Sequence, residues 1–159
     1  MNNVYLLLGS NLSDPHEQLQ IARKHITTHI GKVIKQSSIY KTAAWGDADQ
    51  PDFLNQVLFI KTKSIAEKIL EKILEIERQM GRIRTKKNAP RIIDIDILFY
   101  NQDIKQANQL TIPHPEIQNR RFVLVPMNEL SPRLVHPVLK KTIQTLLSEC
   151  PDKLDVKKI

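Results

Sequence analysis

The chain is poor in cysteine, glycine and long apolar runs, and each shortage narrows what the protein can be. Its 159 residues include a single cysteine, Cys150, so no internal disulfide can form and we expect a reducing, cytoplasmic environment. The four glycines form no GxxxxGKS or GxxxxGKT pattern, which excludes a P-loop nucleotide site. The first apolar run extends only from Val4 to Leu8, so we expect neither a signal peptide nor a membrane-spanning segment there.

Positive charge is what the chain has in excess. Lysine and arginine number 24 against 17 aspartate and glutamate residues, which gives a formal net charge of +7. A basic surface attracts polyanions, among them nucleic acids, anionic membranes and phosphorylated small molecules. The net charge alone does not indicate which of these partners binds. The distribution of the positive residues is more informative, because they are concentrated in GRIRTKK (residues 81–87) and NRR (residues 119–121). The length fits one domain spanning residues 1–159.

Hydrophobic periodicity predicts the element order β-α-β-β-α-β. Helical spacing predicts a first helix that begins after the N-cap Asp14 and ends at Gly31. It predicts a second helix over residues 64–81, with Ser64 and Glu67 as a capping box. This order indicates an α+β, ferredoxin-like sandwich: an antiparallel sheet with both long helices on one face and extra C-terminal elements. The predicted strands cover residues 4–9, 33–40, 53–62 and 92–100.

The last third of the chain is harder to assign from its pattern. Residues 104–108 could form a short strand, and prolines predict a loop over residues 110–121. Residues 121–132 have helical apolar spacing, but Pro126 would break or kink a helix, so this assignment stays open. We expect a helix over residues 142–150 and a frayed, solvated tail after it.

Two aspartates interrupt the otherwise apolar segment IIDIDILFY (residues 92–100). Side chains alternate along a strand, so we expect Asp94 and Asp96 on the same face. Two carboxylates this close repel each other unless a cation lies between them. Mg²⁺ typically binds one or two carboxylates together with substrate phosphates. The opposite, core-directed face is expected to carry Ile93, Ile95, Ile97 and Phe99.

The aspartates could instead lie on a solvated face of the sheet, but two observations argue against this. The face that they occupy is not otherwise polar, since Ile92, Leu98 and Tyr100 are expected to share it. In addition, cationic residues that suit phosphate binding come shortly before the pair, namely Arg82, Arg84, Lys86, Lys87 and Arg91. The pattern therefore predicts a magnesium–nucleotide site whose phosphate contacts come from side chains, above all from arginine.

Five segments, taken in order, resemble one enzyme family: LLLGSNL, YKTAAWGDADQPDFLNQV, EIERQMGRIR, KNAPRIIDIDIL and LTIPHPEIQNRRFVLVPMNELSP. They are similar to the 6-hydroxymethyl-7,8-dihydropterin pyrophosphokinases of the folate pathway, from the first strand almost to the C-terminus. The resemblance implies transfer of a pyrophosphoryl group from ATP to the pterin hydroxymethyl oxygen, with release of AMP. It implies two Mg²⁺ ions as cofactors and the substrate hydroxyl as nucleophile. The expected partners are ATP and the pterin, bound by a monomer that binds neither nucleic acid nor membrane.

The resemblance also implies a role for each residue that matches a family motif. Asp94 and Asp96 match the pair that holds magnesium, and Arg82 and Arg91 match arginines that contact the triphosphate and support transfer. The implied ATP-binding residues are Glu77, Arg84, Lys87, Ile97, Thr111, His114 and Arg120. The implied pterin-binding residues are Thr42, Ala43, Trp45, Phe53, Asn55 and Phe122.

The pterin ring explains the residue types at its implied site. Phe53 and Phe122 would stack on its two faces, and the Asn55 amide would bind its hydrogen-bonding edge. Taken without the family, both phenylalanines are ordinary core candidates, and His114 is an ordinary turn-stabilising histidine.

Two segments depart from the family pattern. Asn88 and Ala89 stand where a tryptophan often precedes GPR, which puts the usual aromatic cover from this loop in doubt. Residues 43–45 read AAW, where prolines and a leucine are common in the family. Our hypothesis is that Trp45 supplies compensating aromatic cover.

A basic ferredoxin-like domain could alternatively bind RNA, as RRM domains do. An RRM exposes aromatic side chains on its central strands, so that they stack on the bases. Here a strand carries aspartates instead, and carboxylates repel phosphodiesters. A purely structural module would leave the combination of carboxylates, arginines and His114 without an explanation.

Overall fold

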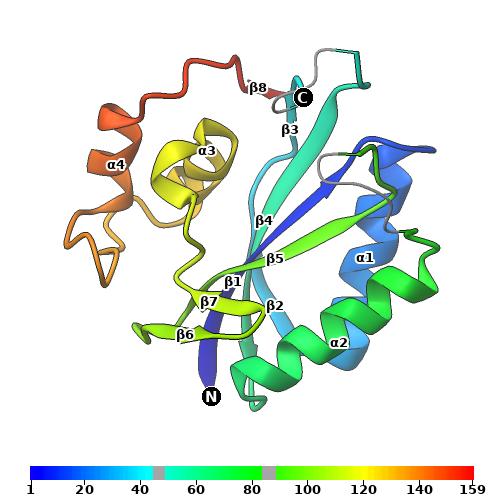
Figure 1. Ribbon diagram of the computed structural model, residues 1–159, viewed down its shortest axis with the longest axis horizontal. Coiled ribbons are helices and arrows are strands. Elements are labelled where there is room, and N and C mark those ends of the chain that lie inside the picture. The colour runs from blue at the N-terminus through cyan, green and yellow to red at the C-terminus, as the bar shows by residue number, and fades with distance from the viewer. Residues whose placement is uncertain (45–48, 84–88) are drawn as a thin grey trace.

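A computed structural model describes residues 1–44, 49–83 and 89–159 of the chain. Its main sheet is antiparallel, with strand order β5-β1-β4-β3-β8, and β2 also pairs with β4 (Figure 1). The strands are β1 (Asn2–Ser10), β2 (Lys32–Gln36), β3 (Tyr40–Thr42), β4 (Phe53–Thr62), β5 (Asp94–Tyr100), β6 (Lys105–Ala107), β7 (Leu110–Ile112) and β8 (Lys157–Lys158). The helices are α1 (Pro15–His29), α2 (Ala66–Gln79), the 3₁₀ turn η1 (Ile117–Asn119), α3 (Arg121–Leu130) and α4 (Ile143–Glu149).

Strand β1 lies at the centre of the sheet, between β4 and β5. Its core is the continuous apolar run VYLLL rather than an alternating pattern, which is typical of a strand covered on both faces. Val4, Leu6 and Leu8 point into one hydrophobic cluster, and Tyr5 and Leu7 point into a second. The two clusters are covered by different pairs of helices, so the sheet forms the middle layer of the molecule (Figure 1).

Helices α1 and α2 cover the first face of the sheet together. The buried isoleucines of α2, Ile69, Ile73 and Ile76, recur at intervals of three or four and so form one stripe along the helix. Each such buried side chain contributes roughly 1.5–3 kcal/mol by leaving water. The predicted N-cap of α1 is confirmed, because the Asp14 side chain accepts a hydrogen bond from the Glu17 N–H.

Helices α3 and α4 cover the opposite face. The open assignment of residues 121–132 is thereby decided: α3 is a helix in spite of Pro126. Val123, Leu124 and Met127 are buried in the second cluster, and this burial offsets the hydrogen bond that a proline cannot donate. None of the helices within the described ranges is long and apolar enough to span a membrane.

A β-bulge in β5 corrects the predicted alternation of residues 92–100. Ile97 pairs with Leu6 and Phe99 pairs with Tyr5, so Leu98 is the extra residue and the strand turns over at that point. Phe99 therefore packs in the second cluster with Leu98, not with the isoleucines, and Tyr100 packs in the first. The alternation predicted for Asp94 through Ile97 is unaffected, because these residues precede the bulge.

Several smaller expectations were wrong. Helix α2 begins at Ala66 with Ile65, not Ser64, as its N-cap and without a side-chain cap, and Glu67 forms an ion pair with Lys105. The predicted strand over residues 33–40 is divided into β2 and β3. Part of the predicted loop over residues 110–121 is strand β7, which pairs with β6 in a two-stranded sheet. The tail is not frayed throughout, because β8 pairs with β3.

Candidate active site

A cavity of roughly 610 Å³, counting its open mouth, lies where β1, β4 and β5 meet the start of α3. It brings together predicted magnesium, arginine and pterin residues from segments far apart in the sequence. Its walls are Leu7, Gly9, Thr42, Ala43, Gln50, Phe53, Asn55, Arg91, Asp94, Asp96, Arg120 and Phe122. We call this cavity the first pocket.

A second pocket opens on the other side of the aspartates, between α2 and β5. Its walls are Leu70, Ile73, Leu74, Glu77, Asp94, Ile95, Asp96 and Gln109. Asp94 and Asp96 are the residues common to both sets of walls. A ligand in one pocket and a ligand in the other would therefore meet at the carboxylate pair.

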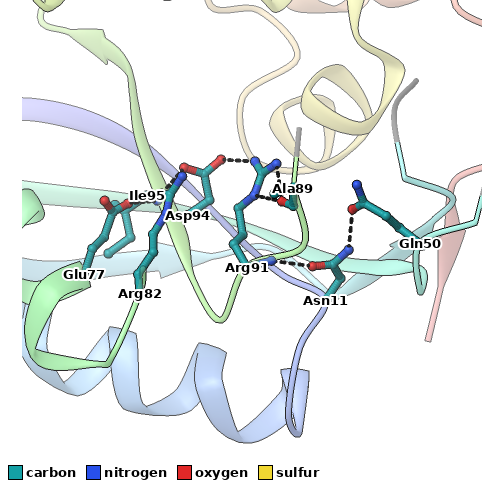
Figure 2. A network of polar contacts seen from close by, with 8 residues as sticks. All are labelled: Asn11, Gln50, Glu77, Arg82, Ala89, Arg91, Asp94 and Ile95. Carbon is teal, nitrogen blue, oxygen red and sulfur yellow. Dashed lines mark hydrogen bonds and ion pairs between the residues drawn. The ribbon is translucent and has the colours of Figure 1, made fainter. Parts of the chain in front are cut away.

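Two arginines hold Asp94, one on each carboxylate oxygen. Arg82 Nη1 lies 2.9 Å from Asp94 Oδ1, and Arg91 Nη1 lies 3.3 Å from Asp94 Oδ2 (Figure 2). Arg82 reaches this position because Gly81 ends α2 with a φ of +93°, in the left-handed region that favours glycine. The predicted helix terminus at Gly81 is thus confirmed, and it turns Arg82 back toward β5.

Glu77 supports this arrangement from α2. Its carboxylate is buried, and Oε2 accepts hydrogen bonds from Arg82 Nη1 at 3.1 Å and from the Ile95 N–H at 2.8 Å (Figure 2). Glu77 therefore aligns Arg82 and satisfies a backbone donor at the start of β5. It also lines the second pocket.

Asp96 is in a different electrostatic position from Asp94. Within the described part of the chain, no group donates a hydrogen bond to its carboxylate. Burial, with added repulsion from Asp94 and Glu77, raises the pKa of Asp96 to about 8, although Arg120 and Arg82 oppose the shift. A cation that binds this carboxylate would relieve the repulsion.

The donor set fits Mg²⁺ bound together with a phosphorylated ligand. Among the described residues, no group of three or more histidine, cysteine, aspartate or glutamate side chains could hold a metal alone. Two neighbouring carboxylates suit Mg²⁺, which commonly keeps water and substrate phosphate oxygens as its other ligands. Asp94 and Asp96 are therefore the residues that would hold it.

The aromatic side chains of the first pocket each lie near a guanidinium group. Arg91 Cζ is 5.3 Å from the ring centroid of Phe53, and Arg120 Cζ is 5.8 Å from that of Phe122. These distances allow cation–π attraction. Phe53 and Phe122 come from the start of β4 and the start of α3, so a flat ring in this pocket has an aromatic side chain from each.

The Asn55 amide is held in place at the floor of the same pocket. Its Nδ2 donates to Thr42 Oγ1 at 3.0 Å, and the residue is buried. A Cβ atom on Gly9 would lie only 2.9 Å from Asn55 Oδ1, so a larger residue at position 9 would displace the amide. Gly9 is a site residue that the sequence pattern did not reveal, because its role depends on the neighbouring strand.

His114 has the turn-stabilising contacts that its sequence context also allowed. Its Nδ1 accepts a hydrogen bond from the Glu116 backbone N–H at 3.1 Å, and the His114 backbone N–H donates to the Leu98 carbonyl at 3.0 Å. Burial and the nearby Arg120 lower the pKa of His114, which favours the neutral imidazole. Thr111 on β7 and Ile97 on β5 line neither pocket.

The implied site residues and the observed pocket walls do not coincide completely. Trp45, Arg84, Lys87 and Asn88 lie outside the described residues, so their implied roles stay predictions. Wall residues that the sequence did not single out are Leu7, Gly9, Gln50, Leu70, Ile73, Leu74 and Gln109.

The chain matches known proteins along most of its length. Residues 5–132 match the model of the family described as 7,8-dihydro-6-hydroxymethylpterin-pyrophosphokinase (HPPK). The 2-amino-4-hydroxy-6-hydroxymethyldihydropteridine pyrophosphokinase of Haemophilus influenzae is 42% identical over 141 residues, covering 86% of each chain. The enzyme of the same name from Aquifex aeolicus is 36% identical over 149 residues, covering 94% of this chain and 92% of its own.

The folic acid synthesis protein fol1 of Schizosaccharomyces pombe is 40% identical over 94% of this chain, which spans only 20% of that protein. The solved structure of wild-type Plasmodium falciparum HPPK-DHPS superimposes with a TM-score of 0.75 at 19% identity, over 93% of this chain and 44% of that one. The structural likeness supports the fold, and the family model and the two full-length relatives confirm the resemblance seen in the sequence. The chain belongs to the 7,8-dihydro-6-hydroxymethylpterin-pyrophosphokinase family of enzymes.

Proposed function

We propose that the chain transfers the pyrophosphoryl group of ATP to the hydroxymethyl group of 6-hydroxymethyl-7,8-dihydropterin. The products are AMP and the pterin diphosphate, as family membership implies for folate biosynthesis. The observation that carries the proposal is the pair of pockets that meet at Asp94 and Asp96. One pocket offers aromatic faces and a buried amide, and the other offers an apolar helix wall.

The two pockets suit the two substrates. The pterin would lie in the first pocket between Phe53 and Phe122, with its edge on Asn55. The nucleotide would lie in the second pocket against Leu70 and Leu74, with its phosphates directed to the aspartates. The pterin hydroxyl and the β-phosphate would then meet at the boundary, where transfer requires them to be close.

Magnesium belongs to this proposal as two ions held by Asp94, Asp96 and the ATP phosphates. When bound, such ions neutralise charge on the transferred group and on the leaving oxygen. The carboxylates orient the ions, and the substrate hydroxyl acts as the nucleophile. No protein nucleophile is required for this transfer.

Arg82 and Arg91 would supply the remaining positive charge. Each guanidinium uses part of its donor fork on Asp94, so other N–H groups stay available to phosphate oxygens. Because Asp94 would also bind magnesium, ligand binding exchanges some of these contacts. Arg82 and Arg91 thus move from balancing Asp94 to balancing the triphosphate.

The other residue roles implied by the family form the rest of the proposal. Arg84, Lys87, Ile97, Thr111, His114 and Arg120, with Glu77 beside them, would serve the nucleotide. Thr42, Ala43 and Trp45 would serve the pterin together with the residues named above.

We further propose the ferredoxin-like topology, supported by the sheet order β5-β1-β4 with β2 and β3 beyond β4. A single monomeric domain in the cytoplasm is proposed on the same grounds as in the sequence.

The RNA-binding alternative finds no support in the sheet. Both faces of the central strands carry buried clusters in the described residues, so these strands have no open face for base stacking. Filter binding to RNA is expected to show no specific complex.

Release of AMP tests the proposal directly. Purified protein with ATP and Mg²⁺ should form AMP only when 6-hydroxymethyl-7,8-dihydropterin is added, and chelation of the metal should stop the reaction. Reactions without pterin and reactions with the Asp96→Asn variant are the controls. Protein that binds RNA but forms no AMP with both substrates present would overturn the proposal.

A further inference from the structure

Asn11 follows β1 and is nearly fully buried, with only 2% of its surface exposed. Figure 2 shows it between two segments that line the first pocket, one carrying Arg91 and the other carrying Gln50. Neither the sequence pattern nor the implied substrate contacts give this residue a role. Its contacts connect the two segments to each other.

On one side, Asn11 holds the backbone of Arg91 at both of its polar groups. The Asn11 N–H donates to the Arg91 carbonyl at 3.2 Å, and Asn11 Oδ1 accepts from the Arg91 N–H at 2.9 Å. On the other side, Asn11 Nδ2 donates to Gln50 Oε1 and to the Pro51 carbonyl, each at 3.1 Å. Both ends of the buried amide are therefore used, on different segments (Figure 2).

The Arg91 side chain is oriented from this fixed backbone. Its Nε and Nη2 donate to the Ala89 carbonyl at 3.0 and 2.9 Å, while Nη1 reaches Asp94. Its guanidinium also lies over the Phe53 ring. Arg91 thus stands between the carboxylate that serves the phosphates and the aromatic wall that serves the pterin.

The segment on the other side leads directly to the aromatic wall. Gln50 lines the first pocket, and Pro51 is two residues from Phe53. A ligand that shifts this segment would change the hydrogen bonds of Asn11 Nδ2, and the same rigid amide would transmit the change to the Arg91 backbone.

We propose that Asn11 is a positioning residue that couples occupancy of the pterin pocket to the placement of Arg91. The inference rests on the proposed function. Through this coupling, bound pterin raises the affinity for magnesium–nucleotide, and bound nucleotide raises the affinity for pterin by the same factor. A merely structural Asn11 would stabilise the fold and leave this factor unchanged.

The test is a binding cycle with the Asn11→Asp variant. Aspartate keeps the acceptor for the Arg91 N–H but loses the donor to Gln50 and Pro51. Calorimetry measures the Kd of Mg²⁺–α,β-methylene-ATP, which cannot be cleaved at that bond, with and without saturating 6-hydroxymethyl-7,8-dihydropterin. We call the Kd without pterin divided by the Kd with pterin the coupling ratio. For the wild type we expect a ratio of about 5 or more, in the usual range of coupling between sites. For the variant we expect a ratio below about 2.

Two further variants separate coupling from stability and from added charge. Asn101→Asp is the matched control: Asn101 Oδ1 accepts from the Asn3 N–H at 2.9 Å and Nδ2 donates to Asn2 Oδ1 at 3.1 Å, at the other end of the β1–β5 pair. It should lower the melting temperature and keep the wild-type ratio. Gln50→Leu removes one acceptor of Asn11 without adding charge, and it should lower the ratio partway.

The outcomes are distinct. A wild-type ratio retained in both Asn11→Asp and Gln50→Leu overturns the inference, even if both variants melt earlier. A wild-type protein that binds both ligands with a ratio of 1 also overturns it, while the proposed function stands. A wild-type protein that binds neither ligand overturns the proposed function itself.

Discussion

Asp96 and Glu129 are carboxylates in two regions of the molecule whose surroundings shift the carboxyl pKa in opposite directions. Glu129, on α3, accepts hydrogen bonds from the Ser38 N–H at 3.0 Å, from Ser38 Oγ at 3.0 Å and from the Tyr40 hydroxyl at 2.7 Å. Burial alone would raise the pKa of Glu129, but these hydrogen bonds outweigh it and lower the pKa. The pKa of Asp96 is raised instead, because Asp96 is buried beside other carboxylates.

The difference separates a carboxylate that has hydrogen-bond donors within the fold from one that has none among the described residues and lines both pockets. Glu129 connects α3 to the segment between β2 and β3, and its interactions are complete without any ligand. Asp96 has no such donors among the described residues, and its repulsion from Asp94 and Glu77 is relieved either by protonation, which its raised pKa favours, or by a bound cation. Perturbed carboxylates in a pocket are in general associated with function, and here the contrast with Glu129 gives that association a physical basis.

The largest expected effect is on turnover, from Asp96→Asn. Loss of a magnesium-binding carboxylate should reduce kcat by roughly 10³-fold or more, as for other groups that neutralise charge in phosphoryl transfer. Stability should not fall, because the neutral amide removes repulsion with Asp94 and Glu77. Rates of AMP formation and thermal melting in magnesium-free buffer check the two halves of this prediction. Near-normal turnover would show that Asp96 does not hold the metal.

Asp94→Asn serves as the counterpart of that experiment. It should also abolish turnover, but it should lower the melting temperature, because Arg91 loses an ionised partner and Arg82 loses one of two, keeping Glu77. Equal melting temperatures for the two variants would contradict the distinction drawn between the neighbouring aspartates.

Arg82→Ala should give the next largest effect. Turnover should fall by about 10²–10³-fold, because a phosphate-directed guanidinium is lost. The free energy of unfolding should fall by about 1–3 kcal/mol, because Glu77 stays buried without its arginine. Steady-state kinetics and urea denaturation measure both quantities. An unchanged kcat would restrict Arg82 to a structural role.

Glu129→Gln should lower stability and leave turnover nearly unchanged, which is the opposite of the result expected for Asp96→Asn. The free energy of unfolding should fall by only about 0.5–1 kcal/mol, since solvent screens the charge of Glu129. Turnover should stay within about twofold of the wild type, because Glu129 lines neither pocket. Urea denaturation and the AMP assay on the same preparations provide the comparison. A loss of turnover larger than the loss of stability explains would contradict it.

The smallest expected effect is the pH dependence of the stability difference between the wild type and Glu129→Gln. A carboxylate whose pKa is lowered by folding stabilises the protein above its unfolded pKa, and the contribution disappears as the pH falls through the folded pKa. The stability gap between the wild type and Glu129→Gln should therefore be full above about pH 5, because the unfolded glutamate pKa is about 4.3, and it should shrink as the pH falls further. Denaturation curves across this range measure the gap, and a gap that widens in acid would contradict the assignment.

The sequence predicted the helices better than it predicted the contacts between segments. The stripe Ile69, Ile73 and Ile76 is a local pattern, and so is the left-handed terminus at Gly81. The failed capping box at Ser64 and Glu67 shows the limit of such patterns, because the N-cap is Ile65 and Glu67 instead pairs with Lys105 of a distant strand.

The candidate site shows the same division. The pattern of Asp94 and Asp96 was visible because alternation within one strand is local. The roles of Gly9 and Asn11 were not visible, because they depend on which segments lie beside β1. Register is equally non-local: the bulge at Leu98 exists only in relation to Tyr5 and Leu6.

The bulge at Leu98 changes which face of the sheet the odd-numbered and the even-numbered residues of β5 occupy. Upstream of Leu98, the odd positions Ile93, Ile95 and Ile97 pack in the first cluster, and the even positions Asp94 and Asp96 line the first pocket. Downstream the parity is exchanged, so that Phe99 and Tyr100 serve the opposite cores. Without Leu98, Phe99 would still lie opposite Tyr5 and Tyr100 opposite Val4, so both residues would keep their clusters. The bulge therefore adds one apolar residue to the second cluster and leaves Asp94 and Asp96 in register with Gly9 and Leu7.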